Sequence, residues 1–369
     1  MQKSYLVIAI ALVVFVSGCA QADLVKKSFE KAEALEKGAG YTTDYNLALS
    51  ISFNDAFKEY AKKDPQTASG LSALQNAKFN LKLSDSIANN GNNRKIVLDL
   101  SDAAAAMALA NPSLAANSPK KQVVSQYKAG SELTTCVEFD EAYLTSQGSD
   151  LSGPICIKGN EKELSKIGLG SIAQSFNQYS SNLPSSTLEI LQSLYGKGLL
   201  TVGNIKDESI IGRSCKSVAF SVNDMTKLSD EELIKLIGGG ATASGAPTEN
   251  LAQAATILKS LLKKFSEELC FDSEHGVPLR NTAEVTTDLS SVIKFSAQQS
   301  KSLVPADKQA EFENKLKEIP DNLQMVTSMF AEATVFRTPP LPSDYTIPSE
   351  IKVMTADEAK SRLPGLGEA

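Results

Sequence analysis

The chain contains a single histidine, His275, in the short segment 273–278. A histidine can act as a general base or a metal ligand, but either role needs partner groups. The sequence has no G-x-S-x-G segment to supply a nucleophilic serine, and it has no P-loop. We therefore expect His275 to be an exposed turn residue, and we predict neither a catalytic site nor a metal site.

Other candidate groups also fit structural roles better than catalysis. Asp99 with Asp102, and Glu231 with Glu232, are carboxylate pairs that suit solvated surfaces or helix caps. The glycine-rich segment 168–171 lacks the remaining positions of a nucleotide-binding fingerprint. The sequence thus predicts a protein that is not an enzyme and that needs no cofactor.

The sequence that precedes Cys19 is the most specific signal in the chain. Lys3 is followed by the uncharged run 5–16, which is too short for a spanning helix of about 20 residues and is typical of a signal peptide. Ser17 and Gly18 before Cys19 resemble the lipobox, in which the cysteine receives lipid and begins the mature chain. We predict a lipoprotein signal peptide over 1–18, export, and a lipid anchor on the outer face of the cell membrane. The alternatives are an ordinary signal peptide and an uncleaved anchor.

Four further cysteines follow, and an even number in an exported protein suggests disulfides. We predict the pairs Cys136–Cys156 and Cys215–Cys270, because each pair lies on neighbouring predicted strands. A four-cysteine zinc site is the alternative, but the C-x-x-C spacing that favours such sites is missing.

Composition narrows the choice of partners. The net charge is −6, aromatic residues make up 6% of the chain, and tryptophan is missing. An acidic chain is not attracted to nucleic acid, and few aromatic platforms are available for bases or sugars. The expected partners are the membrane through Cys19, a lipid or other apolar ligand, and other envelope proteins, but no nucleic acid.

Alternation of apolar and polar residues predicts half-buried strands along most of the chain. The clearest are 45–53, 79–87 and 96–100, the last two joined by the tight-turn sequence 89–92. Further strands are predicted at 122–128, 133–139, 155–158, 199–205, 214–222, 270–272, 277–287 and 292–297. Helical periodicity is seen at 24–37, 57–62, 251–269 and 305–319, and 323–336 fits either helix or strand.

Nine apolar residues of the first three strands should lie on one face, which must be covered or line a cavity. These candidate ligand-binding residues are Leu47, Leu49, Ile51, Phe79, Leu81, Leu83, Ile96, Leu98 and Leu100. The alternative is an ordinary packed core.

The elements together predict an α+β fold with an antiparallel sheet and helices inserted at a few places. We expect one domain over 19–336, with helical insertions at about 160–196 and 229–268. The segment 337–369 is rich in proline and is expected to be an extended tail.

The order of elements resembles the LolA-like superfamily of lipoprotein and lipid carriers, including the anchored LppX and LprG type. The local match is Cys270-Phe271-Asp272 followed by the Gly-x-Pro-Leu turn at 276–279, and 45–51 resembles the first strand of that family. The resemblance implies a curved half-barrel sheet with helices covering its concave face, and an apolar hollow between them for acyl chains. The protein would then bind or carry a lipid, whereas the alternative is a structural or interaction lipoprotein with a filled core.

Overall fold

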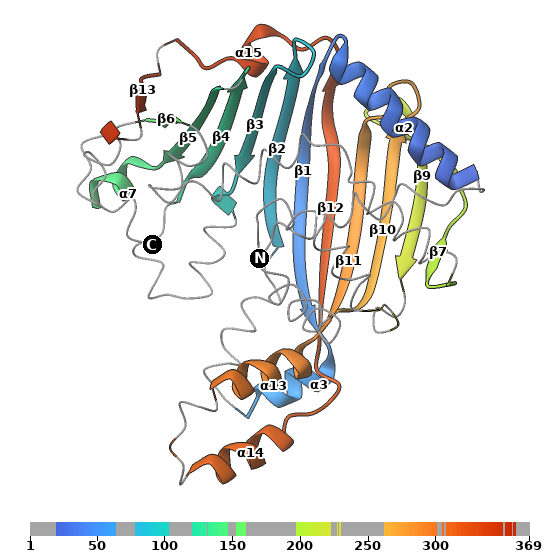
Figure 1. Ribbon diagram of the computed structural model, residues 1–369, viewed down its shortest axis with the longest axis vertical. Coiled ribbons are helices and arrows are strands. Elements are labelled where there is room, and N and C mark those ends of the chain that lie inside the picture. Colours follow the sequence, from blue (N-terminus) through green and yellow to red (C-terminus); the bar gives the residue numbers. More distant parts are fainter. Residues whose placement is uncertain are drawn as a thin grey trace.

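A computed structural model of the 369-residue chain gives the arrangement of its secondary structure (Figure 1). It describes residues 20–63, 78–102, 120–130, 132–146, 153–159, 197–222, 227, 229, 262–300, 305, 308–349, 351–355 and 357–358. Within these ranges, no helix has the length and apolar character needed to cross a membrane. Cys19, the insertion 160–196 and most of the insertion 229–268 lie outside the described residues.

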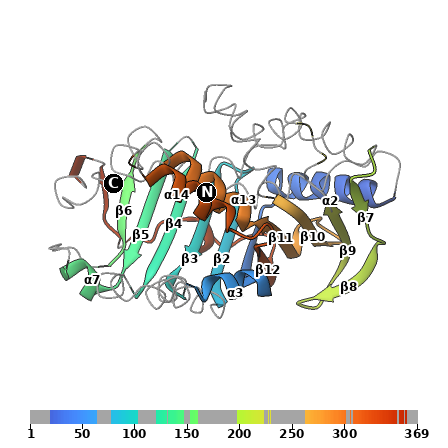
Figure 2. The ribbon, with the colours of Figure 1, turned by 90° about the horizontal axis from the view of Figure 1, so that it is seen from below.

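The described fold is a mixed α+β structure dominated by one open, curved sheet of 13 strands (Figures 1 and 2). The strands run in the order β13-β6-β5-β4-β3-β2-β1-β12-β11-β10-β9-β7, and β8 pairs with β9. Their bounds are β1 Tyr41–Phe53, β2 Lys78–Ala88, β3 Asn93–Asp99, β4 Gln122–Ala129, β5 Glu132–Phe139, β6 Ile155–Lys158, β7 Leu200–Val202, β8 Lys206–Ile210, β9 Arg213–Val222, β10 Leu262–Asp272, β11 Pro278–Asp288, β12 Gln324–Arg337 and β13 Val353–Thr355.

The late strand β12 joins the two halves of the sheet, because it pairs with β1 on one side and β11 on the other. All these pairings are antiparallel except that of β13 with β6. The predicted antiparallel sheet is therefore confirmed, and the strand alternative for 323–336 is the correct one.

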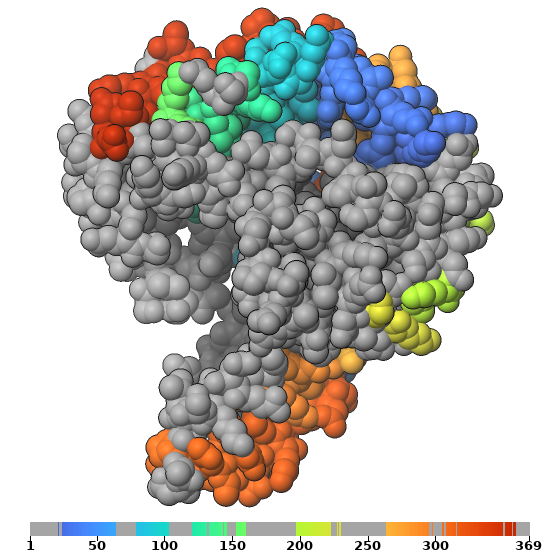
Figure 3. Space-filling view, viewed as in Figure 1, coloured from blue at the N-terminus to red at the C-terminus, as the bar shows by residue number. Residues whose placement is uncertain are grey.

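The described helices gather mainly around the ends of the sheet. They are α2 Ala20–Lys37, α3 Asp55–Ala61, α7 Glu141–Ser146, α13 Leu289–Ser300, α14 Gln309–Lys317 and α15 Pro342–Tyr345. Helix α2 crosses one end of the sheet near β9 to β12, and α13 and α14 project beyond the other end (Figures 1 and 3). A helix layer over the whole concave face stays a prediction.

Strict alternation gives the sheet two chemically different faces. We call the face that carries Leu47, Leu81 and Leu98 the apolar face, and the face that carries Asn46, Lys82 and Asp99 the polar face. The assignment follows from the register, because directly paired residues of neighbouring strands point to the same side.

The hairpin of β2 and β3 forms as the sequence predicts. Asn89, Asn90 and Gly91 take φ values of 52°, 58° and 75° in the turn. Asparagine and glycine tolerate this left-handed region better than other residues, which explains their placement here.

Helix α2 is confirmed, and it is fixed to the sheet by a close backbone approach. The ring of Phe29 packs edge-on against Phe271 at 5.6 Å between centroids. Gly276 has φ +74°, and a Cβ there would lie 2.0 Å from the carbonyl oxygen of Ser28. Only glycine permits both this backbone conformation and this contact.

Both predicted disulfides are present in the structure, and both lie on the polar face. Cys136 of β5 is directly opposite Cys156 of β6, and the two are bonded. Cys215 of β9 is bonded to Cys270 of β10. The zinc alternative is therefore excluded, because all four thiols are used in disulfides.

The beginning of the C-terminal segment is joined to the sheet. Ile347 and Ile351 pack against the Cys136–Cys156 bond, and β13 then pairs with β6 at the sheet edge. Thr355 and Glu358 each accept a hydrogen bond from the other's backbone N–H, as in a capping box. The extended tail expected here is thus partly secondary structure.

Two helix and strand assignments made from sequence are wrong. The helix predicted over 251–269 gives way to β10 from Leu262 onward, since pairing with β9 and β11 buries Phe265 and Leu269 on the apolar face. The expected strand 292–297 is part of α13, whose Ile293 packs in the cluster around Phe53. In the first case strand pairing outweighs helical periodicity, and in the second helix packing outweighs apparent strand alternation.

Candidate functional site

The nine predicted ligand-binding residues share the apolar face. Leu47 is paired with Leu81, Leu49 with Phe79, and Leu83 with Leu98. Ile51, Ile96 and Leu100 follow the same alternation along their strands. The structure therefore brings all nine together, although no described cavity opens over the whole set.

Most of these side chains are only partly covered. Phe79 and Ile96 are buried, each 6% exposed, and the other seven are of intermediate exposure. Leu100 packs against the buried cluster around Val124 and Ile157, so this end of the set belongs to the core. The half-buried leucines of β1 and β2 form the accessible part of the candidate site.

Polar groups occur on the same face toward α2. Arg94 donates two hydrogen bonds to the Asp85 carboxylate, at 3.0 and 2.7 Å. Burial alone would lower the pKa of Arg94, but Asp85 outweighs it and raises that pKa. Burial is the main reason that the pKa of the nearby Glu36 is raised, and the Tyr41 hydroxyl donates to its carboxyl at 3.3 Å. The apolar face is thus bounded at this end by a half-buried polar cluster that contains the Arg94–Asp85 ion pair.

Glu267 is a buried acid on the apolar face that the sequence analysis missed. Its side chain is 2% exposed and lies between Phe220 of β9 and Ala283 of β11. Neither carboxyl oxygen has a hydrogen-bond partner, and the same holds for the side-chain oxygen of the diagonal neighbour Asn281. Burial raises the pKa of Glu267 to about 8, and the Asn281 side chain, which lowers it, offsets only part of this rise.

The reason for missing Glu267 is the helix expected over 251–269. On a helix its carboxylate would belong to the solvated face, whereas on a strand it lies on the same face as the buried Phe265 and Leu269. If the segment had been assigned as a strand, Glu267 would have appeared as a charged residue at a position where the alternation calls for an apolar one.

His275 lies in a turn, as predicted, but its side chain is half-buried rather than exposed, at 19%. Its backbone N–H donates to Oδ2 of Asp272 at 2.8 Å, and its ring Nδ1 lies 2.9 Å from the same oxygen. Arg213 donates to both oxygens of that carboxylate at 2.9 and 3.0 Å, and its guanidinium stacks 4.7 Å from the ring centroid of Phe336.

These contacts give the side chains of the turn a structural role. Burial alone would raise the pKa of Asp272, but the hydrogen bonds from Arg213 and His275 outweigh it and lower that pKa. Asp272, Glu274 and His275 place ligand atoms within 4.8 Å of one another. The guanidinium of Arg213 already occupies the carboxylate of Asp272, so the arrangement is a salt-bridged turn rather than an open metal site.

Of the two carboxylate pairs, Asp99 with Asp102 lies within the described residues. Burial alone would raise the pKa of Asp99, but hydrogen bonds from the hydroxyl and backbone N–H of Ser101 outweigh it and lower that pKa. This is a local turn contact and not an acid–base pair. Glu231 and Glu232 lie outside the described residues, as does the segment 168–171.

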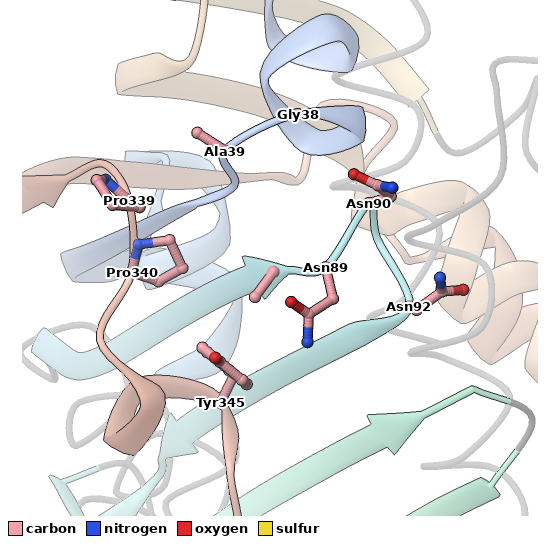
Figure 4. A pocket seen from close by; sticks show the side chains of 9 residues that line it. Gly38, Ala39, Asn89, Asn90, Asn92, Pro339, Pro340 and Tyr345 are labelled. Carbon is pink, nitrogen blue, oxygen red and sulfur yellow. The ribbon is translucent and has the colours of Figure 1, made fainter.

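Two depressions occur among the described residues. The first lies where α2 ends beside the β2–β3 turn, and Figure 4 shows asparagines of that turn on one side and Pro339 and Pro340 on the other. It is lined by Gly38, Ala39, Ala88, Asn89, Asn90, Asn92, Pro339, Pro340 and Tyr345. The second lies over β1, β2 and β12 and is lined by Asn46, Leu47, Ala48, Asn80, Leu81, Lys82, Asp99, Asp102 and Phe330. By register most of the second set belongs to the polar face, so neither depression contains the full set of nine.

Comparisons with known proteins define no family for this chain. No protein-family model matches it, and no curated protein matches it. Among solved structures it is similar to the complex of Pseudomonas aeruginosa MucA/MucB, with a TM-score of 0.32 and 8% sequence identity, over 90% of this chain and 64% of that chain. A likeness at this level carries no argument about function, and the LolA-like resemblance stays a prediction.

Proposed function

We propose that this protein is exported, anchored to the membrane by lipid on Cys19, and binds a lipid or other apolar ligand on the apolar face of its sheet. The observation that carries the proposal is the alignment of half-buried leucines on neighbouring strands. Leu47 and Leu81 form one cross-strand pair, and Leu49 and Phe79 form the next. Apolar surface that is incompletely covered gains free energy when an apolar ligand removes it from water, about 25 cal/mol per Å².

The cellular setting supports the proposal. The two disulfides indicate an oxidising, extracytoplasmic environment. A protein held at a membrane surface has a supply of apolar ligands beside it. Two or more lipid chains at Cys19 would give a stable anchor.

The proposal is tested first by what the protein carries. The full-length protein is purified from membranes, extracted with organic solvent, and the extract is analysed by mass spectrometry. We expect a stoichiometric lipid besides the covalent anchor, and we expect that lipid to raise the melting temperature of the extracted protein when it is added back.

Matched charge substitutions test whether the apolar face is the site. Leu47→Glu and Leu81→Glu each place a carboxylate on that face, so binding of a fluorescent acylglycerol should weaken by about tenfold or more. Asn46→Glu and Asn80→Glu place the same charge one residue away on the exposed polar face, and should change affinity by less than about twofold.

An empty extract together with no acylglycerol binding would refute the proposal and favour the structural lipoprotein. Equal loss of binding in the Asn46→Glu and Leu47→Glu variants would place the ligand elsewhere. Anchoring is checked separately with Cys19→Ser, which should release the protein from membranes.

A further inference from the structure

The buried pair Glu267 and Asn281 is the feature of the apolar face that the packing of β9, β10 and β11 leaves unexplained. Three side-chain oxygens, two on Glu267 and one on Asn281, are buried with no hydrogen-bond partner. An unpaired buried polar group costs about 1–3 kcal/mol, more if it is charged. Native structures keep such groups rarely, and each one calls for an explanation, such as strain, a catalytic role, or a bound water or ion.

On the described strands next to Glu267, no charged side chain faces its carboxyl. Its direct neighbours are Phe220 and Ala283, and the diagonal positions on β9 are Val218 and Val222. On its own strand the same face carries Phe265 and Leu269. Asn281 and Val285 complete the set on β11, so no titratable side chain on the described strands faces the carboxyl.

When Glu267 is ionised, all three unpartnered oxygens are acceptors, so what is then missing is a donor group. A primary ammonium carries three N–H donors. Three acceptors on one patch match that number, and the negative charge of an ionised Glu267 would neutralise the positive charge of the ammonium in this buried site. A ligand carboxylate would instead place like charges together.

We propose that Glu267 and Asn281 form a head-group site for an apolar molecule that carries a primary amine, the alkyl part of which lies across the leucines of β1 and β2. This rests on the proposed function, and it names the ligand class.

The geometry of the sheet links the two parts of the site. Glu267 lies in the same row as Ala283, Met329, Leu49 and Phe79, because these residues are paired across β10, β11, β12, β1 and β2. Three strand spacings of about 4.8 Å separate Glu267 from Leu49, which makes about 14 Å along the sheet.

The neighbouring row has small side chains where the alkyl part would pass. Asn281 is paired with Ala331, and Ala331 with Leu47. Ala283 and Ala331 both lie on the path between the acid and the leucines, and alanine side chains take up the least space on a sheet face. A chain attached to an amine at Glu267 can therefore reach the leucine pairs without crossing a bulky strand residue other than Met329.

The test compares three probes of equal chain length: dodecylamine, dodecanol and dodecanoate. Binding to the full-length, delipidated protein is measured by isothermal titration calorimetry. We expect the amine to bind about tenfold or more tightly than the alcohol, and the carboxylate to bind weakest. Glu267→Gln keeps the shape of the side chain, and should remove the preference for the amine while leaving dodecanol affinity within about twofold.

Glu268→Gln is the matched control, because the adjacent residue lies on the polar face and should not affect any probe. A second readout does not depend on a variant. Amine binding requires an ionised Glu267, so the affinity should rise by about tenfold per pH unit up to about pH 8, with release of a proton. The affinity for dodecanol should not rise with pH.

The outcomes separate the two proposals. Equal affinities for amine and alcohol, unchanged by Glu267→Gln, would overturn the head-group site while leaving an apolar ligand site in place. No binding of any probe would overturn both. A Glu267→Gln protein that does not fold leaves the pH course of the wild-type protein as the deciding measurement.

Discussion

Replacing Glu267 by glutamine should remove a specific loss of stability at alkaline pH. The folded protein raises the pKa of this carboxyl from 4.5 to about 8 because it is buried among apolar residues. A raised pKa contributes stability that is fully present below the unfolded value and is lost as the pH rises through the folded value. The free energy of unfolding therefore falls between pH 4.5 and about pH 8.

The size of the effect follows from the shift. Each pKa unit corresponds to about 1.4 kcal/mol, so the full shift from 4.5 to about 8 amounts to roughly 5 kcal/mol. Glutamine stays neutral at every pH and avoids this loss. At about pH 5 the wild-type protein and Glu267→Gln should have similar free energies of unfolding, whereas at about pH 9 the variant should be the more stable one.

The assay is urea unfolding of the delipidated protein, followed by circular dichroism at a series of pH values. Glu36 also has a raised pKa, chiefly through burial, but it is present in both proteins and cancels in the difference. Glu268→Gln on the polar face should track the wild-type protein across the series. Parallel pH curves for the wild-type protein and Glu267→Gln would refute the reasoning, because they would mean that Glu267 has a donor partner or reaches water.

Two further perturbations test the fold itself. Gly276→Ala should lower the free energy of unfolding by about 2 kcal/mol or more, because the added Cβ would meet the Ser28 carbonyl. Gly212 has a similar φ of 75° but open space around it, so Gly212→Ala should lower that free energy by only about 1 kcal/mol. Both values are measured by urea unfolding. Removing the Cys215–Cys270 bond, which spans 55 residues, should cost about 4 kcal/mol by the chain-entropy model, as measured by thermal melting of the double serine variant. Equal effects of the two glycine substitutions, or an unchanged melting temperature without the disulfide, would contradict these assignments.

The polar network at the β10–β11 turn gives the short segment 273–278 a structural role. Asp272 is nearly inaccessible, at 2% exposure of its side chain, and is held by Arg213 through two hydrogen bonds. Gly276 in the same turn touches α2 through Ser28. The turn that carries His275 thus also forms the contact between α2 and the sheet.

Local sequence determined much of the first half of the sheet. Alternation alone assigned Leu47, Leu81 and Leu98 to one face, and the asparagine and glycine turn at 89–92 joined β2 to β3. These features depend on neighbours in sequence, so periodicity and turn chemistry are enough to predict them. The disulfide partners followed as well, because adjacent strands bring their cysteines together.

The contacts that define the candidate site needed the tertiary structure. Only the pairing of β12 with both β1 and β11 places Leu49 and Glu267 in one row, although more than half of the chain separates them in sequence. The apolar residues of 251–269 fit a helical period, and β10 forms because β9 and β11 bury its alternate side chains instead. The sequence therefore determined which residues are apolar and alternate along each strand. Long-range strand pairing determined which of them lie next to one another, and it buried Glu267 among them.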